Sequence, residues 1–216
     1  MKIIEKELKY ILNKDNFHKF KEFLEDRYIK KDSFNQINYY IDNKFLELNS
    51  RAIRLRIRDV LNDRIELTLK SPIAHNEIMA HAHIKMEETI ELTHVNMENL
   101  IEHGIHCNKE IVEFIDNRLN EVIDIKSLTI IGQLETNRTN YSIDDIDDLI
   151  SLDISNYLGK EDYEVEWECS DLTFCNGVLL NFFRELEINY EKDKTSKTSR
   201  FLRRLNKLKD MEDIIT

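Results

Sequence analysis

The sequence predicts an α+β fold in which about eight β-strands, with helices at the ends and in one middle excursion, form a single domain over residues 1–216. Two observations predict the mixture of elements. Short segments that alternate apolar and polar residues recur along the chain, and apolar residues at helical spacing lie between them. A third observation favours one domain, because only four glycines and one proline are available to form linkers.

In the first half of the chain we expect a strand, a helix and four more strands. The first strand covers residues 2–10, and Asp15 is predicted to cap the helix that follows. Apolar residues at helical spacing indicate this helix: Phe17, Phe20, Phe23 and Leu24. The later strands are expected over residues 37–41, 52–58, 64–70 and 82–92. The second and third of these form a hairpin around a polar turn at residues 62–63.

The second half is expected to add two short helices, three strands and two longer helices. The short helices are predicted over residues 97–103 and 109–119, and the strands over 129–138, 149–157 and 163–169. An amphipathic helix then carries Phe174, Val178, Phe182 and Leu186 on its apolar face, and the basic segment 192–209 includes a final helix. We interpret Trp167, Phe174 and Phe182 as packing residues between the strands and a helix.

The composition excludes several classes of protein. With 41% hydrophobic and 34% charged residues, the 216-residue chain is typical of a soluble globular protein. Its net charge of −11 argues against nucleic acid as the main partner, and no apolar run is long enough to span a membrane, so the cytoplasm is the default location. Three cysteines without a paired spacing predict neither a disulfide frame nor a zinc site.

Five of the predicted strands have one uniformly polar or charged face. Among these faces are a basic one, with Arg54, Arg56 and Arg58, and an acidic one, with Glu164, Glu166 and Glu168. A solvated sheet face is the simpler interpretation of any single strand, but solvated faces tend to mix charges of both signs. Three like charges on one face repel each other, so each such strand needs an opposite charge, a metal or an anionic ligand nearby.

These charged faces suit the binding of polyphosphate. Guanidinium and ammonium groups bind phosphate oxygens through charge-assisted hydrogen bonds, and clustered glutamates supply the oxygen ligands that Mg²⁺ or Mn²⁺ prefers. A metal held in this way would neutralise phosphate charge and activate a water for in-line attack. A closed β-barrel fits this chemistry, because closure removes sheet edges and encloses an interior wide enough for one small ligand.

Eight motifs occur in order along nearly the whole chain. They are EKELK (5–9), YYID (39–42), IRLRIR (53–58), ELTLK (66–70), the segment 132–138 that ends in Arg138, LD (152–153), YLG with EVEWE (157–159 and 164–168), and SK with RF (196–197 and 200–201). This series resembles the CYTH domain, the triphosphate tunnel metalloenzyme superfamily, whose signature is ExExK. Within that superfamily the chain is most similar to CYTH proteins of low-GC Gram-positive bacteria.

The resemblance implies an eight-stranded antiparallel closed tunnel that hydrolyses or cyclises triphosphate compounds with Mg²⁺ or Mn²⁺. The implied phosphate-binding residues are Lys9, Arg54, Arg56, Arg58, Lys70, Arg138, Lys197 and Arg200. The implied metal ligands, and with them the catalytic residues, are Glu5, Glu7, Glu164 and Glu166. Glu168 would support them, and Glu87 and Asp153 are further metal-binding candidates. The strand at 82–92 departs from the family, since a His81, His83, Lys85 and Glu87 face replaces the usual two carboxylates.

The favoured function is metal-dependent hydrolysis of inorganic triphosphate or a related triphosphate compound. The enzymatic alternatives are a class IV-type adenylate cyclase and a thiamine triphosphatase, so tripolyphosphate, ATP and thiamine triphosphate are the candidate ligands. A non-catalytic protein that binds polyphosphate or nucleotide and a plain β-sandwich interaction module are alternatives from other classes. A homodimer is one assembly that we consider. We interpret His81 and His83 as a solvent-facing or loop pair rather than a zinc site, and residues 144–148 as a solvated loop.

Overall fold

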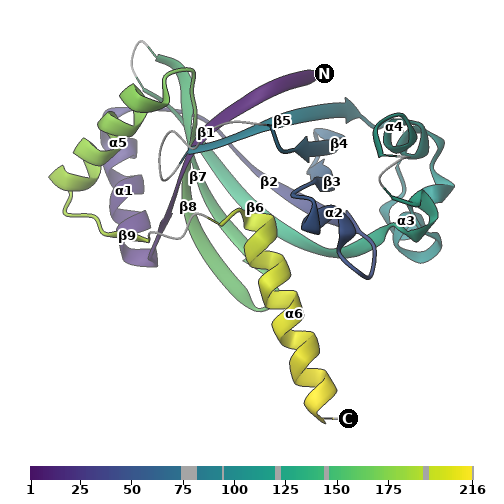
Figure 1. Ribbon diagram of the computed structural model, residues 1–216. Helices are drawn as coiled ribbons and strands as arrows, with labels where there is room; N and C mark the ends of the chain where they lie inside the picture. Colours follow the sequence, from purple (N-terminus) through teal and green to yellow (C-terminus); the bar gives the residue numbers. More distant parts are fainter. Residues whose placement is uncertain (74–81, 94, 120–122, 144–145, 192–194, 216) are drawn as a thin grey trace. The chain divides into compact units, whose positions relative to one another are not determined.

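Figure 1 shows the computed structural model, which describes every residue except 74–81, 94, 120–122, 144–145, 192–194 and 216. Six α-helices, two 3₁₀ helices and nine strands lie in the part that it describes. In chain order they are β1 (Lys2–Leu12), α1 (Lys14–Arg27), β2 (Ile29–Asp42), α2 (Glu47–Ser50), β3 (Arg54–Val60), β4 (Arg64–Ser71), β5 (Ala82–Glu91), α3 (Met97–His103), η1 (Ile105–Cys107), α4 (Lys109–Leu119), η2 (Ile125–Ser127), β6 (Thr129–Ile143), β7 (Ile146–Tyr157), β8 (Lys160–Glu168), α5 (Leu172–Glu185), β9 (Tyr190–Glu191) and α6 (Lys197–Ile215).

The strands form one sheet with the hydrogen-bonded order β5-β4-β3-β2-β6-β7-β8-β1-β9. β5 also pairs with β1, so the eight long strands form a closed ring of pairings, and the short β9 is added on β1. Neighbouring strands are antiparallel, as in the hairpins β3–β4, β6–β7 and β7–β8. The predicted fold class, an eight-stranded antiparallel closed β-barrel with flanking helices, is confirmed.

The chain divides into two compact units, which we describe separately. Unit 1 comprises Met1–Ile4, Gln36–Ala74 and Lys85–Leu134, and unit 2 comprises Glu5–Asn35, His75–Ile84 and Glu135–Thr216. Four strands, β1, β2, β5 and β6, contribute residues to both units.

The core of unit 1 lies between β3, β4 and the helices α3 and α4. Leu55 and Ile57 of β3 and Leu67 of β4 are buried in it and belong to the same hydrophobic cluster as Ile111 and Phe114 of α4. Side chains alternate across a strand, so burying Leu55 and Ile57 directs their arginine neighbours to the opposite face of β3.

The core of unit 2 lies between strands β1, β7 and β8 and helices α1 and α5. Tyr10 and Trp167 are among its largest buried side chains. The ring of Phe183 on α5 lies 5.2 Å from that of Tyr10 and 5.3 Å from that of Phe20 on α1, both edge to face. Because these residues occupy one face of β1 and β8, the alternate residues of both strands lie on the other face.

Two predictions for the helices of unit 2 are wrong. Asn13, not Asp15, caps α1, because its Oδ1 accepts the hydrogen bond of the Asn16 amide at 2.8 Å. Phe174 is 55% exposed instead of packing. The buried face of α5 is Leu172, Cys175, Leu179 and Phe183, while the predicted Val178, Phe182 and Leu186 pack against the core only partly. A shift of one residue turns a helix face by about 100°, so the two faces overlap without coinciding.

Within the described residues, no helix is long and apolar enough to cross a membrane.

Candidate functional site

Unit 2 carries a row of acidic side chains on the face of β8 that points away from its core. Asp162, Glu164, Glu166 and Glu168 share this face, because Tyr163, Val165 and Trp167 are buried on the other one. The antiparallel register sets Glu164 opposite Asp153 of β7, and Glu166 opposite Lys9 of β1. The two-residue turn between β7 and β8 fixes this register with two left-handed residues, Leu158 (φ 46°) and Gly159 (φ 71°).

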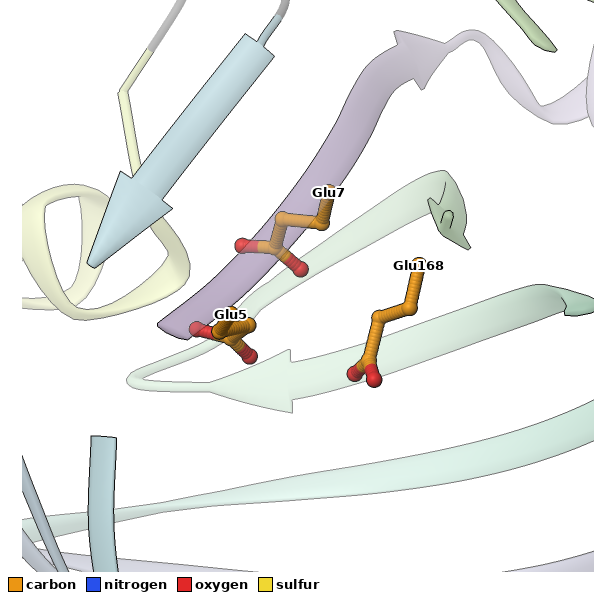
Figure 2. Close-up of side chains that lie close together, drawn as sticks. All are labelled: Glu5, Glu7 and Glu168. Carbon is orange, nitrogen blue, oxygen red and sulfur yellow. The ribbon is translucent and has the colours of Figure 1, made fainter. Parts of the chain in front are cut away.

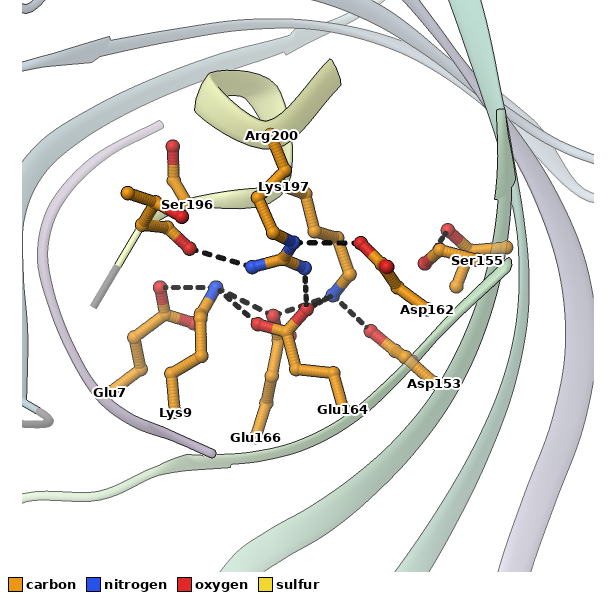
Figure 3. A network of polar contacts seen from close by, with 12 residues as sticks. Glu7, Lys9, Asp153, Ser155, Asp162, Glu164, Glu166, Ser196, Lys197 and Arg200 are labelled. Carbon is orange, nitrogen blue, oxygen red and sulfur yellow. Dashed lines mark hydrogen bonds and ion pairs between the residues drawn. The ribbon is translucent and has the colours of Figure 1, made fainter. Parts of the chain in front are cut away.

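Lys9 lies inside this acidic row (Figure 3). Its Nζ is 2.7 Å from Oε1 of Glu166, 3.2 Å from Oε1 of Glu7 and 3.4 Å from Oε1 of Glu164. Burial by itself lowers the pKa of Lys9, but the three glutamates raise it well above its usual value. Lys9 therefore carries a fixed positive charge.

Arg138 and Asp153 form a bidentate pair across β6 and β7. Nε of Arg138 donates to Oδ1 of Asp153 at 2.8 Å, and Nη2 donates to Oδ2 at 2.6 Å and also to Glu166. Asp153 has no exposed surface. Burial alone would raise its pKa, but Arg138 and Lys197 lower it, so Asp153 stays ionised.

The first turn of α6 adds two more cations (Figure 3). Nζ of Lys197 lies 2.6 Å from Oε1 of Glu166 and also bonds Asp153, while Arg200 donates to Oε2 of Glu164 at 2.6 Å. The predicted phosphate-binding residues of unit 2 are thus brought together: Lys9, Arg138, Lys197 and Arg200. The carboxylates Asp153, Glu164 and Glu166 are interleaved with these cations, so the four cations do not form a basic set separate from the acidic one.

Three other carboxylates form a candidate metal group (Figure 2). One oxygen each of Glu5, Glu7 and Glu168 lies within 4.8 Å of the others. Glu7 and Glu168 are register partners in the β1–β8 pair, and Glu5 lies two residues before Glu7, on the same face of β1. Three carboxylates this close repel each other, and hard oxygen donors suit a small divalent cation such as Mg²⁺ or Mn²⁺. The donor set therefore fits the metal that the resemblance implies.

Unit 1 carries a row of basic side chains on β3, β4 and β5, which we call the basic row: Arg54, Arg56, Arg58, Lys70 and Lys85. Arg54 of β3 is the register partner of Lys70 of β4, and Lys70 is the partner of Glu87 of β5. Nζ of Lys70 lies 2.8 Å from Oε2 of Glu87. Burial would raise the pKa of Glu87, but Lys70, Arg56 and Arg58 lower it to about 2. Glu87, a predicted metal ligand, thus lies among cations.

Arg56 has two buried N–H groups, on Nε and Nη2, that find no hydrogen-bond acceptor in the described part of the chain. A buried donor without an acceptor costs about 1–3 kcal/mol, and more when the group is charged. Lys85 of β5 shows the same surplus of positive charge. Burial lowers its pKa, and Arg54 and Lys70 lower it further. An anionic ligand would accept hydrogen bonds from the N–H groups of Arg56 and offset the positive charge of this row.

Two residues of unit 2 were not assigned to the site from the sequence. Asp162 accepts from Nε of Arg200 at 2.8 Å, and the signal for it was its place two residues before Glu164 on the same strand face. His83 is half-buried, and burial lowers its pKa, while Lys9 lowers it further. It is therefore not the solvent-facing residue that we expected, and His81 lies outside the described residues.

Comparisons with known proteins agree with this geometry. Residues 4–202 match the model of the CYTH domain. The Bacillus subtilis (strain 168) protein named "Putative triphosphatase YjbK" is 31% identical over 169 residues, which is 78% of each chain. The solved structure of a putative adenylate cyclase from Bacillus halodurans has a TM-score of 0.73 and 26% identity, covering 93% of this chain and 98% of that one.

A second solved structure shares the fold at lower identity. It is the putative adenylyl cyclase HpAC1 from Hippeastrum, described as having a dominant triphosphatase activity, with a TM-score of 0.72 and 22% identity over 91% of this chain and 94% of that one. The match to the family model, in contrast, spans nearly the whole sequence. The chain belongs to the CYTH domain family.

Proposed function

We propose that the chain is a divalent-metal-dependent triphosphatase that hydrolyses inorganic triphosphate or a related triphosphate compound. The observation that carries this proposal is the double role of Glu7. Its carboxylate belongs to the candidate metal group with Glu5 and Glu168, and it also lies 3.2 Å from Nζ of Lys9 in the cation network. Glu7 therefore links the candidate metal group to Lys9, one of the cations that would bind phosphate, and all of these residues lie in unit 2.

The basic row of unit 1 supports a polyanionic ligand. The two unsatisfied donors of Arg56 would bind anionic oxygens. Further positive charge in the same row comes from Arg54, Arg58, Lys70 and Lys85. Glu87 offsets one of these charges through Lys70, and a monovalent anion presents fewer charged oxygens than the row has cations. A tripolyphosphate, with several charged oxygens on consecutive phosphorus atoms, matches it better.

Glu5, Glu7 and Glu168 would hold Mg²⁺ or Mn²⁺. Bound there, the ion would offset phosphate charge and activate a water. Lys9, Arg138, Lys197 and Arg200 would bind phosphate oxygens and stabilise the negative charge that the transition state distributes over them. Asp153, Glu164 and Glu166 hold these four cations in place before substrate arrives, so little reorganisation is needed.

In the proposed reaction a water oxygen forms a bond to the terminal phosphorus while the bridging P–O bond breaks. Diphosphate leaves with the bonding electrons, and the water proton passes to solvent or to product. Fixed cations favour this in-line displacement, because the transition state is stabilised mainly by positioning and electrostatics.

The relatives support a triphosphate substrate but differ in the reaction that their names give. The Bacillus subtilis relative is named as a triphosphatase, and the Bacillus halodurans structure as an adenylate cyclase. A cyclase would convert ATP to a cyclic nucleotide and diphosphate, with the ribose 3′-hydroxyl in place of water. Analysis of the products from ATP separates the two reactions.

The test measures phosphate release from tripolyphosphate, ATP and thiamine triphosphate with Mg²⁺, with Mn²⁺ and with a chelator. We expect metal-dependent release of phosphate from tripolyphosphate. Arg56→Ala should weaken the binding of tripolyphosphate, whereas Arg184→Ala, which removes an exposed arginine of α5, serves as the matched control. Tight binding without turnover would identify a binding protein, and absence of both would refute the proposal.

A further inference from the structure

Arg200 has an acceptor at each of its three guanidinium nitrogens. Nε donates to Oδ2 of Asp162 at 2.8 Å, Nη2 to Oε2 of Glu164 at 2.6 Å, and Nη1 to the backbone oxygen of Thr195 at 2.6 Å (Figure 3). Nε and Nη2 form one edge of the planar group, and that edge matches two carboxylates spaced two residues apart on one strand face. These contacts fix the plane of the guanidinium as well as its position.

Tyr157 holds the carboxylate oxygen that Nε of Arg200 uses. Its hydroxyl donates to Oδ2 of Asp162 at 2.6 Å, and the residue is 7% exposed. Burial raises the pKa of the Tyr157 phenol, and Asp162 raises it further, so the hydroxyl remains a donor. Tyr157, Asp162 and Arg200 therefore form a chain of hydrogen bonds from the end of β7, through β8, to α6.

The turn between β7 and β8 makes further contacts with α6. Nε of Arg204 donates to the backbone oxygen of Leu158 at 3.2 Å, and the ring of Phe201 lies 6.2 Å from that of Tyr157. These contacts hold the first two turns of α6 against the hairpin end. The same turns carry Lys197 and Arg200, which reach Glu164 and Glu166.

We infer that Asp162, supported by Tyr157, is a positioning residue that sets the orientation of the Arg200 guanidinium in the site. An arginine side chain has many rotamers, and Glu164 holds only one of the two nitrogens on its edge. The second carboxylate converts a single contact into a fixed plane, which pre-orients Arg200 for a phosphate. The effect of Asp162 on catalysis rests on the proposed function, whereas its effect on the orientation of Arg200 does not.

A double-mutant cycle tests whether Asp162 acts through Arg200. The variants are Asp162→Asn, Arg200→Ala and the two together, and the readouts are kcat/KM for tripolyphosphate hydrolysis and the affinity for tripolyphosphate. Asp162→Asn should lower kcat/KM about tenfold in the otherwise unchanged chain and less than about twofold when Arg200 is already alanine. An equal loss in both backgrounds would overturn the inference, because Asp162 would then act independently of Arg200.

A spectroscopic arm does not depend on turnover. The Nε–Hε signal of Arg200, assigned by its loss in Arg200→Lys, is followed by NMR in protein labelled with ¹⁵N. Asp162→Asn and Tyr157→Phe should both shift this signal and speed its exchange with solvent. Tyr157→Phe keeps the ring and the carboxylate, so it preserves the test should Asp162→Asn fail to fold.

Tyr163→Phe is the matched control, because its hydroxyl donates to Glu161 outside this chain of hydrogen bonds. It should leave the Arg200 signal and kcat/KM unchanged. An Arg200 signal that is the same in Asp162→Asn as in the parent protein would overturn the inference. If the parent protein hydrolyses no triphosphate but its Arg200 signal responds to Asp162→Asn, the proposed function fails and the orienting role stands.

Discussion

The ammonium of Lys70 lies 2.8 Å from the carboxylate of Glu87, so unit 1 carries a negative charge inside its basic row. Arg56 and Arg58 also act on that carboxylate, since they help to lower its pKa to about 2. In this position Glu87 competes with an anionic ligand for the same cations. The family resemblance instead implied that Glu87 binds the metal. Competition with an anionic ligand and metal binding predict opposite effects of replacing Glu87.

Glu87→Gln should tighten the binding of tripolyphosphate measured without metal, by about tenfold, because a Coulombic competitor of roughly 1.4 kcal/mol is removed. The amide keeps the size of the side chain and removes its charge. Isothermal titration calorimetry of the parent and the variant at low ionic strength measures the difference. Weaker binding in the variant, seen only when Mg²⁺ or Mn²⁺ is present, would instead support a role in holding the metal.

The same residue predicts how stability depends on pH. The pKa of Glu87 is about 2 in the folded chain, below the value of about 4.3 for an unperturbed glutamate. The stabilising contribution of its charge is therefore fully present above the unfolded pKa and is lost as the pH falls from about 5 towards 2. In urea unfolding between these pH values, Glu87→Gln should lose less stability on acidification than the parent does.

The control for that experiment is Glu113→Gln, which removes an exposed carboxylate of α4. Its stability should follow that of the parent at every pH. If Glu87→Gln and the parent lose stability in parallel on acidification, the depressed pKa of Glu87 is refuted.

The metal group yields a prediction that separates Glu168 from Glu164. Glu168 belongs to the group with Glu5 and Glu7, whereas Glu164 bonds Arg200 and lies 3.5 Å from Lys197. Added Mn²⁺ should raise the midpoint of thermal unfolding of the parent and of Glu164→Gln, because ligand binding stabilises the folded state. The increase should be largely absent in Glu168→Gln. A lost response in Glu164→Gln with a retained one in Glu168→Gln would reverse the assignment.

The charged faces could be predicted from the sequence because they need only strand alternation. Once Leu55 and Ile57 are taken as buried, Arg54, Arg56 and Arg58 must lie on the other face, and Trp167 and the β8 glutamates follow the same rule. Which charges meet depends on strand order and register. Lys9 and Glu166, which are 157 residues apart, become register partners only in the folded sheet.

The interleaving of cations and carboxylates in unit 2 was not predictable for a similar reason. It is created by Arg138 on β6 and by the first turn of α6, and both meet carboxylates that are distant in sequence. The contact of Asp162 with Arg200 spans 38 residues. No local periodicity carries information about such a pairing, so the motifs suggested candidate residues for the site but neither their pairings nor the part of Asp162.

The final prediction concerns α5, where the predicted apolar face was wrong at Phe174. Phe183 is 2% exposed and packs edge to face on Tyr10, while Phe174 is 55% exposed. Phe183→Ala should therefore cost about 3–5 kcal/mol of unfolding free energy, and Phe174→Ala should stay within about 0.5 kcal/mol of the parent. Chemical denaturation of both variants measures the two costs. A larger cost for Phe174→Ala than for Phe183→Ala would mean that α5 packs through the face predicted from the sequence, with Phe174 against the core.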